Sequence, residues 1–327
     1  MNILLINTLK SLRKLYTNTI RVDIKSKPDC IDNPDIASTI IYEALIDDKP
    51  RMIARFGSVE MSCLMNYIGV KHQAFKYVDY IVGDTQPWWW EPAITNQMRI
   101  NAGFFPPTIG KIEQFCEQML HDIPELDVLG SWLEQENFFK QELVNAKKIH
   151  LRLLEPFWDE NPWTRALEGK KVLVVHPFET EILEQYKIKD QLFKNNILPD
   201  FELKTVKAVM SHADEKTKYV DWFEALDYMK TEIDKADYDI CLIGAGAYGF
   251  PLAVHVKRMG KKAIHMGGSL QLLFGIRGKR WEDPTYGTKE WGIPYGSYSS
   301  LMNEHWIRPG ESVKPLGADK VEGNCYW

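Results

Sequence analysis

Residues 239–270 constrain the fold of this 327-residue chain more than any other stretch. An apolar run at 240–243 leads into a glycine-rich turn, an amphipathic segment and a second apolar run at 263–266. This order predicts strand, turn, helix and strand, which is one βαβ unit. A turn without Cβ atoms lets a ligand approach the backbone, and the helix N-terminus behind it attracts anions. We therefore expect a nucleotide diphosphate at four residues of the turn: Gly244, Gly246, Tyr248 and Gly249.

Predicted strands and helices alternate from about residue 51 to residue 270, which favours an α/β fold. We predict a Rossmann-like, mostly parallel sheet with helices on both faces, and 45% hydrophobic residues suffice for its core. The sequence divides into a helical extension at 1–40, the Rossmann-like domain at 41–275 and a tail at 276–327. The tail is rich in Gly, Pro and aromatic residues, and we expect it to wrap over the domain.

Composition narrows the partners and the cellular compartment. The formal net charge of −5 gives no reason to expect nucleic acid as a partner. The five cysteines are scattered without a C-x-x-C pair, which indicates reduced thiols in the cytoplasm. No apolar run approaches the roughly 20 residues of a membrane span. We expect a cytoplasmic protein.

The first 22 residues leave two interpretations open. They are mildly apolar and carry four basic residues: Lys10, Arg13, Lys14 and Arg21. Such a segment is either a helix packed on the domain or a basic helix resting on an anionic membrane surface. The first interpretation is the simpler one, and the second implies a cytoplasmic protein associated with the membrane.

A second stretch that could form part of a functional site begins at Arg51. We expect a short strand to end at Phe56, Gly57 to form a turn and Ser58 to cap a helix. Arg55 and Glu60 then lie at a strand-to-helix corner, where open parallel sheets bind ligands. The simpler interpretation is that Glu60 only complements the helix dipole.

Other polar residues also follow predicted strands and should reach the same sheet edge. The predicted set comprises Arg55, Glu60, Arg152, Glu155, His176 and His265, together with the glycine turn. Guanidinium groups suit diphosphates through planar contacts with several donors. A carboxylate can act as a base or a metal ligand. A lone histidine at a strand end is often only structural.

Two formal motifs in the sequence point elsewhere. The spacing Gly244-x-Gly246-x-x-Gly249 matches the dinucleotide fingerprint, but the next strand ends at His265 instead of an acidic residue. Binding of NAD therefore remains the alternative. The pair Asp237-x-Asp239 has the spacing of a metal-binding motif, but it precedes its strand and should lie at the opposite edge.

Both stretches together resemble the GT-D-type glycosyltransferases. Arg55-Phe-Gly57-Ser58-Val-Glu60 is similar to their R-F-G-D-G-E segment, and residues 244–268 are similar to their C-terminal glycine-rich segment. Arg55, Gly57 and Glu60 match the first motif. Ser58 and His265 stand where the family has aspartates. The resemblance covers roughly residues 40–275 and implies a Rossmann-like fold of the GT-D type.

The resemblance also implies a hexosyltransferase of bacterial polysaccharide biosynthesis. The expected reaction moves a sugar from a nucleotide-diphosphate donor, a UDP-sugar, to a glycan or lipid-linked glycan. Arg55 and Glu60 are then catalytic, and the expected substrate-binding residues are Gly57, Ser58, Arg152, Glu155, His176, His265 and the glycine turn. Glu60 would also bind a divalent metal, Mn²⁺ or Mg²⁺, although Ser58 removes one carboxylate and leaves metal dependence open. Two alternatives remain: an NAD-dependent nucleotide-sugar oxidoreductase or epimerase, and a non-catalytic sugar-nucleotide-binding scaffold.

Overall fold

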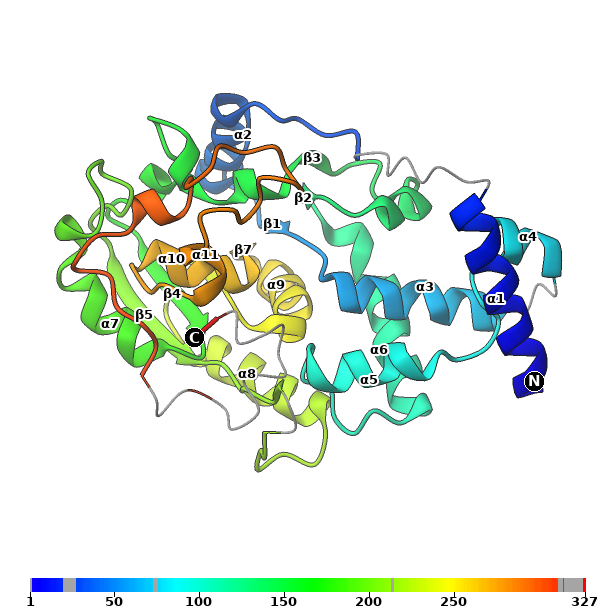
Figure 1. The fold of residues 1–327 in the computed structure, drawn as a ribbon. Helices are drawn as coiled ribbons and strands as arrows, with labels where there is room; N and C mark the ends of the chain where they lie inside the picture. The colour runs from blue at the N-terminus through cyan, green and yellow to red at the C-terminus, as the bar shows by residue number, and fades with distance from the viewer. Residues whose placement is uncertain (1, 20–27, 73–75, 213–214, 311–313, 315–325) are drawn as a thin grey trace.

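A seven-stranded sheet forms the centre of the protein, and every pair of neighbouring strands is parallel (Figure 1). The computed structural model describes residues 2–19, 28–72, 76–212, 215–310, 314 and 326–327. The strands are β1 (Arg51–Ala54), β2 (Val128–Ser131), β3 (Lys147–His150), β4 (Lys171–His176), β5 (Glu202–Lys207), β6 (Ile240–Ile243) and β7 (Lys262–His265). Their order is β3-β2-β1-β7-β6-β4-β5. The predicted α/β, Rossmann-like fold is confirmed.

Helices cover both faces of the sheet because its strands are apolar on both sides. In β4, Leu173 and Val175 face one core, whereas Val172 and Val174 face the other. The first core includes residues of α3 (Ser58–His72), α5 (Pro92–Ile100), α6 (Ile109–Asp122), α8 (Trp222–Lys235) and α9 (Gly249–Arg258). The second includes residues of α2 (Pro34–Ile46), α7 (Glu179–Tyr186) and α10 (Leu270–Leu273).

Short 3-10 helices connect many of these elements. They are Ile123–Glu125, Glu134–Phe139, Leu151–Leu154, Pro156–Trp158, Trp163–Leu167, Lys189–Gln191, Gly246–Tyr248, Gly267–Ser269 and Ser299–Leu301. Strand β3 is short because one of them begins directly after His150. There the Arg152 amide donates to His150 Nδ1 (3.3 Å), and the Glu155 amide donates to the Arg152 carbonyl (3.1 Å).

An aromatic cluster fastens α1 (Ile3–Thr19) and α4 (Tyr77–Val82) to the body of the protein. Leu9 is buried there among Tyr80, Trp88 and Trp89. Lys10 on α1 also forms an ion pair of 2.5 Å with Glu91. One face of α1 is therefore packed on the body of the protein, as the first of the two interpretations expected. Among the described residues, no helix is long and apolar enough to cross a membrane.

The tail builds a smaller core of its own beside the sheet. Trp281 of α11 (Lys279–Glu282), Tyr298 and Trp306 pack against Leu192 and Leu272. The Arg277 amide donates to the Ile307 carbonyl (2.8 Å), which holds two parts of the tail together. At its end, the buried Trp327 lies 6.2 Å from the ring of Phe178. Figure 1 shows residues 276–310 running across the sheet domain.

Capping of α2 gives a stability prediction. Asn33 Oδ1 accepts a hydrogen bond of 2.9 Å from the Ile36 amide, as the Asn-Pro sequence predicts. Thr108 precedes α6 in the same extended conformation, but its side chain makes no capping bond. We expect Asn33→Ala to lower the free energy of unfolding by about 1 kcal/mol and Thr108→Ala to lower it by less than half of that. Urea denaturation of both variants measures the difference, and equal losses would contradict this assignment.

Candidate active site at the carboxyl edge of the sheet

The connections after β4 and β6 leave the sheet on opposite faces. Helix α7 follows β4 and contributes to the second core, whereas α9 follows β6 and contributes to the first. Because β4 and β6 are hydrogen-bonded neighbours whose connections diverge, their carboxyl ends form a topological switch point of the sheet. His176 is the last residue of β4, and Gly244 directly follows β6. The topology therefore places both at the position where open parallel sheets bind ligands.

Three imidazole rings fill the space that the three glycines of the turn leave free. A Cβ atom on Gly244 would lie 2.5 Å from His176 Cδ2, and one on Gly249 would lie 2.0 Å from His265 Cε1. A Cβ atom on Gly246, whose φ is +52°, would lie 3.1 Å from His212 Nε2. The glycine spacing in this chain therefore accommodates its own histidines. This contact gives the motif a structural reason that does not involve a dinucleotide.

The three histidines are neutral at physiological pH. Burial lowers the pKa of His176 to about 3 and that of His212 to about 4. Burial and then the positive charge of Arg55 lower the pKa of His265 to about 3. Near neutral pH, these three histidines therefore add no positive charge to this edge.

The hydrogen bonds of two rings fix which nitrogen carries the proton. His176 Nδ1 accepts from the Phe178 amide (3.1 Å), so the neutral ring carries its proton on Nε2. His265 Nδ1 lies 3.3 Å from the Ile243 carbonyl and donates to it, which leaves a lone pair on Nε2. One ring thus offers a donor and the other an acceptor within the same group of strand ends.

Arg55 follows β1 and lies against the loop after β7. Its guanidinium carbon is 5.3 Å from the ring centre of Trp132, and its Nη1 would be 3.5 Å from a Cβ atom on Gly267. Trp132 is itself held by donating from Nε1 to the Phe56 carbonyl (3.0 Å). Among the described residues, Arg55 has no hydrogen-bonding or ion-pair partner. A half-buried guanidinium with free donors is suited to an anionic ligand.

Glu60 folds back over Gly57 in the first turn of α3. A Cβ atom on Gly57 would lie 1.9 Å from Glu60 Oε2, so only glycine leaves room for the carboxylate there. Desolvation raises the pKa of Glu60 above its ordinary value, against the lowering effects of the Glu60 amide and of Arg55. Ser58, the first residue of α3, is exposed. The arrangement brings one carboxylate with raised basicity close to Arg55.

Arg152 and Glu155 form a second group together with the tail. Glu155 Oε2 accepts from Tyr298 Oη (2.7 Å) and from Trp158 Nε1 (3.1 Å). Burial raises the pKa of Glu155 to about 7. The Arg152 guanidinium stacks 4.5 Å from the ring centre of Trp158, with no ion pair to a described residue. Ser269, in the loop after β7, also interacts with Glu155 and links this group to the strand ends around Arg55.

The remaining predicted residue, Tyr248, supports the turn from the core side. It is 1% exposed, and its ring stacks on Trp222 at 4.8 Å between centres. Its hydroxyl shares a hydrogen bond of 3.0 Å with Ser211 Oγ, which donates to the Gly103 carbonyl (2.6 Å). Tyr248 therefore positions the turn from within, while Gly244 and Gly246 form the turn itself.

Sequence reasoning missed several residues of this edge. Trp132 directly follows the last residue of β2, so the strand-end criterion that selected Arg55 would also have found it. His212 lies several residues beyond β5, and the loop between them hides its relation to Gly246. Two more residues come from the tail, where the sequence carries no periodic signal of their positions. They are Tyr298, which donates to Glu155, and Tyr326, whose ring would lie 2.2 Å from a Cβ atom on Gly268.

The predicted metal site would have Glu60 as its single carboxylate ligand. Among the described residues, no group of three or more His, Cys, Asp or Glu side chains is arranged to hold a metal ion. At the position that the resemblance implies, Glu60 is accompanied by Ser58, which brings no charge. Metal dependence therefore stays a prediction, and we derive no catalytic step through a metal.

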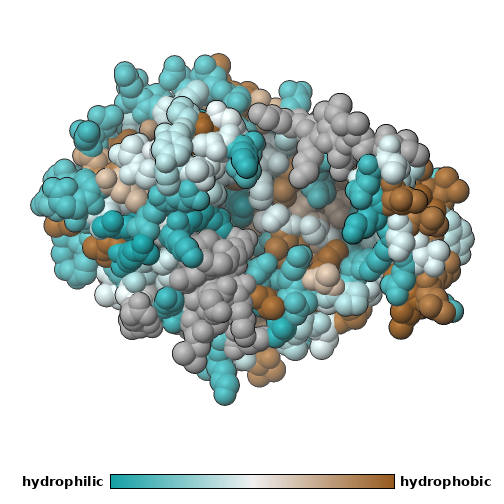
Figure 2. All heavy atoms as spheres, in the orientation of Figure 1, coloured by the Kyte–Doolittle hydropathy of each residue, from teal (hydrophilic) through white to brown (hydrophobic). Residues whose placement is uncertain are grey.

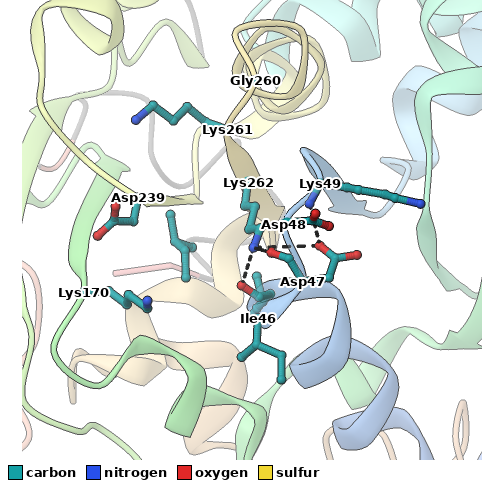
Figure 3. Close-up of a pocket in the computed structure, with 11 residues that line it drawn as sticks. Ile46, Asp47, Asp48, Lys49, Lys170, Asp239, Gly260, Lys261 and Lys262 are labelled. Atoms are coloured by element: carbon teal, nitrogen blue, oxygen red, sulfur yellow. Dashed lines mark hydrogen bonds and ion pairs between the residues drawn. The ribbon is translucent and has the colours of Figure 1, made fainter.

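The surface around this edge is concave. The space-filling view shows a hollow near the middle of this face, where Figure 1 places the beginning of α3 beside α9 (Figure 2). A different hollow of about 330 Å³ lies at the opposite edge, where Asp239 precedes β6 (Figure 3). One of its lysines is already engaged, since Lys262 Nζ donates to the Leu45 carbonyl (2.7 Å) and contacts Asp47. Asp239 accepts from the Lys171 amide (2.8 Å), as expected for a residue at a strand entry.

Comparison of the chain with protein-family models, curated proteins and solved structures found no match. The site is therefore assessed from its own geometry.

The glycine–histidine contacts predict a steric penalty. Gly249→Ala places a methyl group inside the His265 ring position, so one of the two must move. We expect a loss of about 1–3 kcal/mol in the free energy of unfolding. Gly110→Ala is the matched control, because a Cβ atom there would meet nothing within 4 Å. We expect that control to be neutral or slightly stabilising, and urea denaturation compares the two. Similar losses in both variants would contradict the proposed contact.

Glu155 predicts a pH-dependent stability. Its folded pKa of about 7 lies above the ordinary value of 4.5, so the folded protein binds more protons than the unfolded chain between these values. The contribution of Glu155 to stability is therefore greatest below pH 4.5 and falls as the pH rises towards 7. Relative to Glu155→Gln, the wild-type protein should lose roughly 3 kcal/mol across this range. Chemical denaturation at several pH values measures it, and the histidine effects cancel because both proteins share them.

Proposed function

We propose that this protein is a glycosyltransferase that moves a sugar from a nucleotide-diphosphate donor, a UDP-sugar, to a hydroxyl group of a glycan acceptor. One observation carries the proposal. Arg55, with no partner among the described residues, lies at the carboxyl edge of an all-parallel sheet beside a desolvated carboxylate, Glu60. A free cation suits a diphosphate, and a basic carboxylate suits the deprotonation of a hydroxyl group.

The reaction has simple requirements that these residues can meet. The acceptor oxygen forms a bond to the anomeric carbon, and the bond from that carbon to the diphosphate oxygen breaks. The bonding electrons leave with the diphosphate, where Arg55 and Arg152 would stabilise the negative charge. The acceptor proton passes to Glu60. The raised pKa of Glu60 makes it a better proton acceptor than an ordinary glutamate.

The neutral histidines would contribute hydrogen bonds to the donor. His176 keeps an N–H donor at Nε2 beside the turn that begins at Gly244. Its low pKa means that this donor persists without a charge from neutral pH down to about pH 4. His265 keeps an acceptor at Nε2, which suits a sugar hydroxyl group. Together the two histidines would orient the nucleotide-sugar donor, while the arginines neutralise the charge of its diphosphate.

Donor binding is tested first, by thermal shift with UDP, GDP, CDP and NAD, each with and without Mn²⁺. Ligands that bind the folded state raise its melting temperature. We expect a shift with UDP, and Arg55→Gln should weaken UDP binding about tenfold to a hundredfold. Lys49→Gln, an exposed residue beside the hollow at the opposite edge, is the control and should leave the shift unchanged. A shift with NAD alone would support the oxidoreductase alternative and overturn the proposal.

Turnover is tested separately with Glu60→Gln. The variant keeps the shape of the side chain but removes the proton acceptor. With UDP-hexoses and a panel of glycan acceptors, we expect UDP release to fall about a hundred- to ten-thousand-fold, while the UDP thermal shift remains. Full activity of Glu60→Gln would refute its role as base. Binding without turnover in the wild-type protein, across all acceptors, would favour the scaffold alternative.

A further inference from the structure

Helix α1 presents two different faces. One face is buried, where Ile6 and Leu9 pack in the aromatic cluster with Tyr80. The other carries four leucines at helical spacing, Leu4, Leu5, Leu12 and Leu15, which are 75%, 37%, 42% and 61% exposed. The packing that fastens α1 to the body therefore leaves a leucine-rich stripe in solvent.

The neighbouring helix and the first turn of α1 extend this apolar surface. Tyr77 and Val78 of α4 are 44% and 70% exposed, and Ile3 is 73% exposed. We call these seven residues, Ile3, Leu4, Leu5, Leu12, Leu15, Tyr77 and Val78, the α1–α4 patch. Figure 2 shows apolar residues gathered at the end of the molecule where Figure 1 places α1 and α4. Exposed apolar surface concentrated in this way marks an interaction site more often than scattered single residues do.

The charge of α1 indicates what this surface contacts. The helix carries Lys10, Arg13 and Lys14 and no acidic residue, although the whole chain has a formal net charge of −5. Lys14 is exposed, and Lys10 keeps 41% of its side chain exposed while it binds Glu91. A leucine stripe on a helix whose charged residues are all basic complements an apolar layer below negative groups. An anionic lipid bilayer has that structure.

We propose that the α1–α4 patch docks this protein on an anionic lipid bilayer. The leucines of α1 enter the boundary between headgroups and acyl chains, and Lys14 contacts the negative headgroups. The aromatic cluster around Leu9 keeps the helix fixed to the body, so the whole protein is held at the surface. This inference is independent of the transfer reaction, because it uses no residue of the strand-end site.

The test is co-sedimentation of the full-length protein with vesicles of phosphatidylcholine alone or mixed with phosphatidylglycerol. We expect binding to the mixed vesicles that weakens with added salt, and little binding to the neutral ones. The double variant Leu12→Ser/Leu15→Ser should lower the affinity for the mixed vesicles by about tenfold or more. Lys14→Glu should lower it by roughly fivefold for each unit of charge changed.

Matched controls separate an effect on docking from unfolding and from a general change in surface polarity or charge. Val144→Ser/Val220→Ser removes two apolar residues that are 74% and 83% exposed elsewhere on the protein. Lys140→Glu reverses the charge of another exposed lysine. Both controls should bind the mixed vesicles like the wild-type protein. Circular dichroism and melting temperature establish that every variant is folded.

Three results would overturn the proposal. The first is no binding to the mixed vesicles, and the second is equal binding by the wild-type protein and Leu12→Ser/Leu15→Ser. The third is a wild-type dimer in light scattering that Leu12→Ser/Leu15→Ser converts to a monomer, since the patch would then contact a second copy of the chain. Nucleotide thermal shifts do not depend on the patch, so failure of docking and failure of the proposed reaction are distinguishable.

Discussion

The common direction of all seven strands is the constraint on which the rest of the molecule depends. Parallel strands require a crossover between each pair, and the crossovers cover both faces with helices. Every strand then ends at the same edge. Polar residues at the ends of different strands, such as Arg55, His176 and His265, meet there without any local signal that relates them. The direction of the strands alone therefore brings these polar side chains to one edge of the sheet.

Close packing at that edge depends on glycines that leave room for larger side chains. Gly57 leaves room for the Glu60 carboxylate, and Gly244 and Gly249 leave room for the rings of His176 and His265. Such contacts desolvate the polar groups, which raises the pKa of the carboxylate and lowers the pKa of the imidazoles. The result is an edge with neutral histidines, one basic carboxylate and guanidinium groups that carry the positive charge. This division of charge suits a ligand that is negative at one part and neutral at another.

The sequence predicted those elements that have a clear hydrophobic pattern and distinct boundary residues. The strand at Ile240–Ile243 begins and ends where expected, because an apolar run marks it directly. The Asn33-Pro34 cap likewise marks the first residue of the helix Pro34–Ile46. The strand-end criterion also selected Arg55 and His176 for the carboxyl edge. It could not reveal that the glycine turn is packed against histidines from three other segments, because contacts between distant segments leave no periodic pattern. For the same reason, the hydrogen bond from Tyr298 to Glu155 could not be predicted from the sequence.

Helix α3 connects the two regions of the protein for which functions are proposed. It begins at Ser58 in the strand-end site, and its 15 residues span about 22 Å towards α1 and α4 (Figure 1). In its second half, Asn66 donates to the Trp89 carbonyl (2.8 Å) and accepts from the Glu91 amide (2.9 Å). Trp89 packs with Leu9 of α1, and Glu91 binds Lys10, so the link from the site to the apolar patch is continuous. A protein docked through α1 would hold its strand-end site about one helix length from the patch. At that distance from a bilayer, a site meets the head of a lipid-linked glycan and not its acyl chains, which favours this class of acceptor if both proposals hold.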